Sequence, residues 1–173
     1  HVINQIVEKC KEYQINLYIA LIDYKKAFDS LNHNFMLSSL KSQGIPNSFL
    51  NLLKEMYKGL RARVKTDVEG QYFKIKRGVG QGDPLSPILF NCALEQIFRK
   101  LDWENKGVNI NGKKISNLRF ADDIILLSNS EDELNDMISE LAKEGAKSGL
   151  TISIQKTKKL ANQEFQTKTL VYG

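Results

Sequence analysis

Residues 118–127 have the sequence Leu-Arg-Phe-Ala-Asp-Asp-Ile-Ile-Leu-Leu, in which two short apolar runs flank the adjacent aspartates Asp122 and Asp123. Such runs around a polar pair are typical of two strands joined by a tight turn. Because the flanking residues Phe120 and Ile124 are apolar, we expect the turn to lie toward the protein interior. Two neighbouring carboxylates repel each other there and lose hydration unless a cation compensates. The segment therefore predicts a β-hairpin with a metal-binding tip.

A third carboxylate follows another apolar run. Residues 17–22 are short, β-branched and aromatic, which predicts a strand buried on both faces that ends at Asp23. If this strand lies beside the hairpin, three carboxylates meet at one edge of the sheet. Mg²⁺ prefers a few carboxylate oxygens together with water and phosphates, and two such ions can activate a hydroxyl and stabilise leaving pyrophosphate. The pattern therefore indicates phosphoryl transfer.

The remaining elements follow from periodicity and turn residues. We expect helices over about 35–44, 47–60, 85–101 and 131–148, hairpins over 63–76 and 108–115, and a last strand over 150–154. Asp29 or Ser30 can cap the first helix, and Asn111-Gly112 predicts a type I′ turn. Without an internal repeat or linker, this succession favours one α/β sandwich, with helices on one face of the sheet.

Composition limits the class of protein. A chain of 173 residues with 42% hydrophobic residues is long enough for one compact unit, and the net charge of +5 favours a polyanionic partner. No apolar run approaches the roughly 18 residues of a membrane span. Cys10 and Cys92 lack zinc-ligand spacing, and the first residues resemble neither a native start nor a signal peptide. We therefore expect a trimmed, intracellular chain.

Three stretches together carry a family resemblance. Ile22-Asp23-Tyr24-Lys25-Lys26-Ala27-Phe28-Asp29, Gly80-Gln81-Gly82-Asp83-Pro84-Leu85-Ser86-Pro87 and Phe120-Ala121-Asp122-Asp123 resemble, in order and separation, the central motifs of reverse transcriptases of the non-LTR (LINE-type) retrotransposon branch. The resemblance covers nearly the whole chain. It implies a polymerase palm with an RRM/ferredoxin-like antiparallel sheet and part of the fingers. The implied activity is RNA-directed DNA polymerisation, with an RNA template, a DNA primer and dNTPs as partners.

The resemblance also implies how the carboxylates act. Asp23 and Asp122 correspond to the principal ligands of two Mg²⁺ ions, with Mn²⁺ as an alternative, and Asp123 completes the site. Phe28 corresponds to a steric gate that excludes the 2′-hydroxyl of a ribonucleotide. A core aromatic residue is the alternative explanation for Phe28.

Further roles follow in the same way. Tyr24 lies where the family uses backbone N–H groups to bind the triphosphate, and Gln81 and Gly82 match the loop beneath the nascent base pair. Lys156 matches a lysine that protonates or neutralises leaving pyrophosphate, although residues 158–159 offer two more lysines close by. His33 has no ligand partner in the sequence, and we expect it to be structural.

The same resemblance predicts what residues 1–173 leave out of the whole protein. In the family, basic finger residues precede the first motif, and a primer grip and thumb follow the last strand. We therefore expect a palm with partial fingers from a longer polyprotein that works in the nucleus after a cytoplasmic phase. Because positioning supplies much of phosphoryl-transfer catalysis, this chain alone should polymerise poorly.

Other functions remain open at this level. A group II intron or retron reverse transcriptase shares the same metal chemistry. A viral RNA-dependent RNA polymerase fits less well, since it normally has a polar residue in place of Phe28. A remnant without catalytic activity could bind nucleic acid through the basic segments 61–76 and 156–159.

Overall fold

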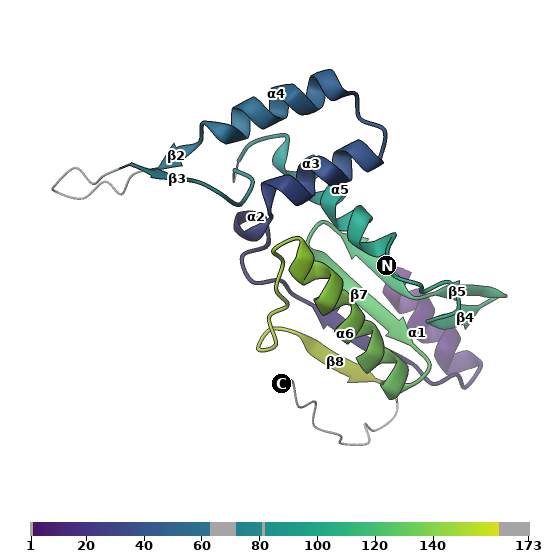
Figure 1. The fold of residues 1–173 in the computed structure, drawn as a ribbon. Helices are drawn as coiled ribbons and strands as arrows, with labels where there is room; N and C mark the ends of the chain where they lie inside the picture. The colour runs from purple at the N-terminus through teal and green to yellow at the C-terminus, as the bar shows by residue number, and fades with distance from the viewer. Residues whose placement is uncertain (1, 63–71, 81, 163–173) are drawn as a thin grey trace. The chain divides into compact units, whose positions relative to one another are not determined.

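A four-stranded antiparallel sheet contains the segments that carry the three aspartates (Figure 1). The computed structural model describes residues 2–62, 72–80 and 82–162. The strands of the sheet are β1 (Tyr18–Ile22), β6 (Asn117–Phe120), β7 (Asp123–Ser128) and β8 (Lys158–Ala161). Their order is β6-β7-β1-β8, and each neighbouring pair is antiparallel. The predicted class, an antiparallel sheet combined with helices, is confirmed.

The chain forms two units, with described residues 2–23, 102–140 and 153–162 in the first and the remainder in the second. Besides the sheet, the first unit contains α1 (Val2–Glu12), β4 (Val108–Ile110), β5 (Lys113–Ile115) and the larger part of α6 (Glu131–Lys147). The second contains α2 (Ala27–Ser30), α3 (His33–Ser42), α4 (Asn47–Lys58), β2 (Arg61–Ala62), β3 (Phe73–Lys74) and α5 (Ser86–Phe98).

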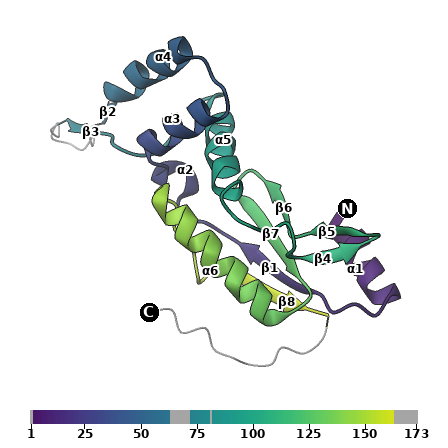
Figure 2. The same cartoon turned by 45° about the vertical axis from the view of Figure 1, so that its right-hand side comes forward.

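The core of the first unit lies on both faces of β1, because alternate residues of a strand point to opposite sides. On one face Ile19 packs with Leu127 and with Ile6 and Cys10 of α1. On the other, α6 is anchored where Asn135 accepts a hydrogen bond from a lysine of β8. Figure 2 shows α1 and α6 on different sides of the strands. Neither α1 nor the cover that it gives to the second face was predicted from the sequence.

The predicted last strand over 150–154 is wrong. Within it, Ile152 forms an isolated bridge to Tyr24, and Ile154 is 65% exposed. The strand forms later in the chain, at Lys158–Ala161, where the backbone pairs with the free edge of β1. Residues 158–161 lack β-branched side chains, so local propensity did not indicate a strand there.

The helices of the second unit follow the predicted apolar stripes, but their ends differ. α3 is capped by Asn32, whose side-chain oxygen accepts hydrogen bonds from the backbone N–H groups of Asn34 and Phe35 at 2.8 and 3.2 Å. The expected caps Asp29 and Ser30 instead lie within the short helix α2. α3 then packs against α4 and α5.

Two predicted features of this unit are only partly as expected. On α4, Leu50, Leu53 and Tyr57 are buried, whereas Phe49 and Met56, which lie on the same apolar stripe of the sequence, are 41% and 48% exposed. A hairpin was expected over 63–76. In the structure β2 pairs with β3, and residues 63–71 lie outside the described part of the chain.

The hairpin of β4 and β5 forms where the sequence predicts it. Asn111 and Gly112 have φ values of 52° and 81°, as the two central residues of a type I′ turn require. Through the described ranges of the chain, no helix combines the length and apolar character that crossing a membrane requires.

Candidate active site

Asp23 follows directly after β1, at the end of the strand where the hairpin of β6 and β7 turns. Its backbone oxygen accepts a hydrogen bond of 2.7 Å from Ser153 N–H, which fixes the chain at this point. Its Oδ1 atom is buried and has no hydrogen-bond partner among the described residues. Leaving a charged oxygen buried without a partner is costly, so this position is suited to a cation.

Asp122 and Asp123 occupy the hairpin that lies against β1. In the register of the sheet, Ile22 pairs with Ile124. Asp23, which comes after Ile22, and Asp123, which comes before Ile124, therefore lie at the same end of this strand pair. Ala121 has a positive φ of 53°, which the first central residue of a type II′ turn adopts and few residues other than glycine accept. The sheet therefore brings the chain positions of the three predicted ligands together.

The expectation that this turn lies in the interior is wrong. Phe120 is 84% exposed, Asp123 is exposed and Asp122 is half-buried. β6 is the edge strand of the sheet, and at the hairpin tip only one side of the strands faces the core. Ile124, which is 1% exposed, faces that core. The tip is thus open to solvent and to any substrate.

The donor set fits a divalent cation in its chemistry, because carboxylate oxygens are the ligands that Mg²⁺ prefers. The buried Oδ1 atom of Asp23 supports that fit. In the described part of the chain, however, no three His, Cys, Asp or Glu side chains are gathered closely enough to hold a metal ion. The three-carboxylate metal site therefore stays a prediction.

Lys156 supplies a positive charge beside Asp23. The chain turns after Ser153, whose backbone oxygen accepts a hydrogen bond from the N–H group of Lys156 at 3.2 Å. This turn places the Lys156 Nζ atom 3.8 Å from Asp23 Oδ1. That distance is too long for a hydrogen bond, so the ammonium group balances the charge without satisfying the oxygen.

The two neighbouring lysines have different surroundings. Lys159 donates a hydrogen bond of 2.5 Å to Asn135 of α6, and burial lowers its pKa below the ordinary value despite the nearby charge of Glu131. Lys158 is exposed on β8. Lys156 is the lysine of this segment that forms an ion pair with Asp23.

In the second unit, the predicted nucleotide-binding residues Phe28 and Gly82 line the same hollow, which has a volume of about 420 Å³. Phe28 is half-buried and stacks on Phe90 with ring centroids 4.7 Å apart. Gly82 has a φ of 89° with open space around it, so the backbone conformation explains the glycine. Gln81 lies outside the described residues.

A hydrogen-bonded loop fixes this hollow. Val79 N–H donates to Phe28 O, and Gly78 N–H donates to Leu31 O, both at 2.8 Å. His33 Nε2 lies 2.7 Å from Gly78 O and adds a third link. His33 was expected to be structural, but its link to Gly78 was not predicted, since the two residues are far apart in the chain.

Tyr24 is 5% exposed and forms a backbone bridge with Ile152. Burial raises the pKa of the Tyr24 hydroxyl well above its ordinary value, and the hydroxyl has no hydrogen-bond partner among the described residues. The side chain is therefore part of the core. A role of its backbone toward a triphosphate stays a prediction.

Comparison with known proteins gives a family. The family model described as "Reverse transcriptase (RNA-dependent DNA polymerase)" matches residues 2–170. The chain is 37% identical over 146 residues to a Pol polyprotein of the retrotransposable element R2 from Nasonia vitripennis, covering 84% of this chain and 14% of the relative. It is 33% identical over 128 residues to that of element R2DM from Drosophila melanogaster, covering 73% and 12%.

A solved structure supports the fold. An apo telomerase from Candida tropicalis, truncated from its C-terminal domain, matches with a TM-score of 0.69 and 20% identity, over 97% of this chain and 37% of the telomerase chain. The predicted palm fold is thereby confirmed. The chain spans about a seventh or less of the R2 polyproteins. It belongs to the reverse transcriptase (RNA-dependent DNA polymerase) family, within the non-LTR retrotransposon branch.

Proposed function

We propose that this chain is the catalytic core with which a retrotransposon protein copies RNA into DNA, adding dNTPs to the 3′-hydroxyl of a DNA primer. One observation carries the proposal: the antiparallel register places Asp23 beside the Asp122-Asp123 hairpin, and Asp23 has a buried oxygen without a hydrogen-bond partner. The R2 relatives favour this function over an intron-encoded or non-catalytic one.

Reverse transcriptases generally use divalent metals. Here Asp23, Asp122 and Asp123 would hold two Mg²⁺ ions, or Mn²⁺ in their place. When bound, such a pair activates the primer hydroxyl and neutralises charge on the reacting phosphate and the pyrophosphate. Asp122 and Asp123 lie at a hairpin tip that is open to solvent, so a metal-bound triphosphate could reach them.

Two other groups act on the nucleotide. Lys156 would transfer its Nζ proton to a leaving pyrophosphate oxygen, or neutralise that oxygen, because its ammonium group already lies beside Asp23. Phe28 would exclude a 2′-hydroxyl from the hollow that it shares with Gly82. Gln81 and the backbone of Tyr24 would complete the binding of the nucleotide.

The proposed setting is a larger protein. The chain would supply the palm and part of the fingers of a polyprotein that acts in the nucleus, while other segments grip the template and primer. The full-length protein is therefore the right material for activity measurements. Isolated residues 1–173 should extend primers poorly, because positioning of the substrates supplies much of the rate.

Substitution of Asp122 tests the function. In the full-length protein, Asp122→Asn should reduce primer extension on an RNA template roughly 100-fold or more, the scale of losing one charge-stabilising group. Asp132→Asn, which changes an exposed aspartate in the first turn of α6, should leave extension unchanged. Full extension by the Asp122→Asn protein would contradict catalysis by these carboxylates, whereas RNA binding without extension by the wild-type protein would indicate a non-catalytic role.

A further inference from the structure

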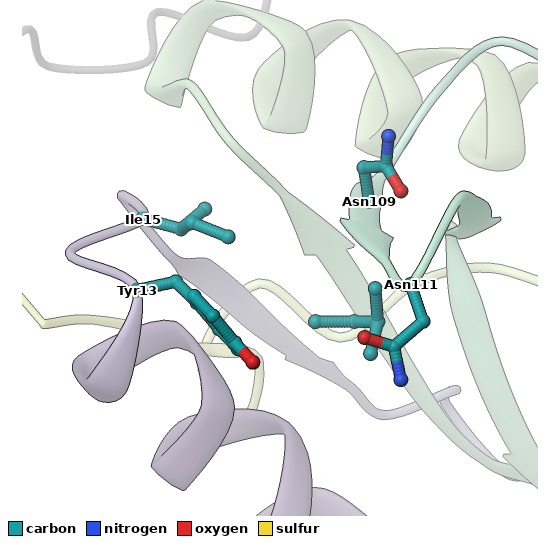
Figure 3. A pocket seen from close by; sticks show the side chains of 5 residues that line it. Tyr13, Ile15, Asn109 and Asn111 are labelled. Atoms are coloured by element: carbon teal, nitrogen blue, oxygen red, sulfur yellow. The ribbon is translucent and has the colours of Figure 1, made fainter.

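A second hollow lies in the first unit, between the end of α1 and the tip of the hairpin of β4 and β5 (Figure 3). Its volume is about 350 Å³, and it is lined by Tyr13, Ile15, Asn109, Ile110 and Asn111. Tyr13 and Ile15 precede β1, whereas Asp23 follows it. The five residues of β1 span roughly 17 Å, so this hollow is separate from the carboxylate edge.

Tyr13 offers an aromatic surface to this hollow. It is 58% exposed, and Figure 3 shows its ring extending from the end of α1 toward Asn111. The Lys9 Nζ atom lies 5.3 Å from the ring centroid. The turn is ordered, because the Ile15 N–H group donates a hydrogen bond of 2.8 Å to Cys10 O. An exposed ring on a fixed backbone is suited to stacking with an unpaired base.

On the hairpin side of the hollow, Figure 3 shows the amide of Asn111 on the side of Tyr13, whereas the amide of Asn109 points away from both. Asn109 and Asn111 are both exposed, and neither side chain has a hydrogen bond within the described residues. An amide presents a donor and an acceptor side by side, which matches the edge of a base such as adenine. The type I′ turn fixes the backbone of Asn111. The hollow therefore combines a stacking ring with an amide that can bind a base edge.

The adjoining surface is basic. On β5, Lys114 pairs with Asn109 and Lys113 pairs with Ile110, and both lysines are exposed. Side chains of directly paired residues lie on the same face of a hairpin, so Lys113 lies on the face of Ile110, and Lys114 lies on the opposite face with Asn109. Lysines in this position can bind the phosphates that flank a base.

We propose that this hollow binds an unstacked base of a single-stranded nucleic acid. The base stacks on Tyr13, its edge bonds to the amide of Asn111, and Lys113, which shares a face of the hairpin with Ile110, contacts a flanking phosphate. A protein partner would need neither the base-sized hollow nor a stacking ring beside an amide and a lysine. The site is independent of the polymerase proposal, since it requires none of the three aspartates.

The base itself can be removed from the probe. Fluorescence anisotropy of the protein with labelled oligo(dA), and with an abasic strand of the same length, separates base binding from phosphate binding. The protein should bind oligo(dA) about tenfold more tightly than the abasic strand, the scale of one aromatic stack. Equal affinities for the two strands would overturn the proposal.

Three variants assign the difference in affinity to this hollow. Tyr13→Leu should abolish most of the preference for oligo(dA), whereas Tyr13→Phe, which keeps the ring, should retain it. Asn111→Gly keeps the turn and removes one amide, so it should weaken the preference at an unchanged melting temperature. An unaltered preference in the Tyr13→Leu protein would overturn the proposal.

Further substitutions separate this site from other nucleic-acid contacts. Lys113→Gln should weaken binding of both strands to a similar extent and reduce the salt dependence of binding. Asp122→Asn should leave the preference for oligo(dA) intact, so that failure of the polymerase proposal and failure of this one are distinguishable. Loss of the preference in Asp122→Asn would place base binding at the carboxylate edge and overturn this assignment.

Discussion

At the scale of single residues, the environment of each predicted group decides what it can do. Asp23 has a buried oxygen without a hydrogen-bond partner and an ammonium group 3.8 Å away, so it is prepared for a cation. Phe28 is half-buried, stacks on Phe90 and lines a hollow. A core aromatic and a steric gate are therefore compatible roles for this one side chain.

Phe28→Val tests the gate. A smaller side chain leaves room for a 2′-hydroxyl, so in the full-length protein the preference for dNTPs over rNTPs should fall roughly tenfold or more, the scale of discrimination by one apolar contact. The ratio of kcat/KM for dGTP and GTP measures it. Phe49→Val, on the exposed side of α4, is the control and should keep the preference. An unchanged ratio in Phe28→Val would leave Phe28 as a core residue alone.

At the scale of elements, the hollow around Phe28 depends on the loop at residues 78–79. Gly78 has a φ of 91°, and a Cβ atom there would lie 2.8 Å from Asp29 O. Gly44, at the end of α3, has a similar φ of 87° but open space around it. A left-handed backbone conformation explains both glycines, but only at Gly78 does a neighbouring backbone also leave no room for a side chain.

Gly78→Ala should destabilise the protein more than Gly44→Ala. Both substitutions force alanine into a left-handed conformation at roughly 1–2 kcal/mol, and Gly78→Ala adds a clash with the backbone of α2. Urea unfolding of the two variants should therefore differ by at least about 1 kcal/mol. Equal losses of unfolding free energy in the two variants would show that the loop moves freely away from α2.

The elements also show what local sequence can predict. The β4–β5 hairpin and the β6–β7 turn were predicted correctly, because Asn111-Gly112 and the Asp pair specify turns within a few residues. β8 was missed, because it is defined by the free edge of β1, far away in the chain. The proximity of Phe28 to Gly82 likewise depends on hydrogen bonds between segments that are far apart in the chain. The family motifs had nevertheless indicated both residues as nucleotide-binding residues.

At the scale of the whole molecule, a carboxylate links α6 to the segment after α5 within the first unit. Glu140 accepts hydrogen bonds of 2.7 Å from Trp103 Nε1 and from Lys106 Nζ. Burial alone would raise the pKa of Glu140, but these two bonds outweigh it and lower the pKa below its ordinary value. The charged form of Glu140 therefore stabilises this unit.

This contribution should depend on pH. Because the pKa of Glu140 is lower in the folded than in the unfolded protein, its stabilisation is complete above the unfolded value and is lost as the pH falls through the folded value. Glu140→Gln should therefore lower the urea midpoint of unfolding at pH 7. It should also make the fall of this midpoint below about pH 4.5 smaller than in the wild-type protein. Fluorescence of Trp103, the single tryptophan, reports this unfolding. Glu104→Gln, at an exposed position, should behave as wild type. A wild-type pH profile for Glu140→Gln would refute the role of this carboxylate.

Cation binding at Asp23 is the most direct test of the three-carboxylate site. Titration with Mn²⁺, followed by electron paramagnetic resonance of the free ion, measures it without requiring catalysis. Asp23→Asn should weaken binding by at least about tenfold, since it removes one charged ligand. Asp29→Asn, in the exposed turn of α2, should bind as wild type does. Equal Mn²⁺ affinity of the Asp23→Asn and wild-type proteins would contradict a metal site at this edge of the sheet.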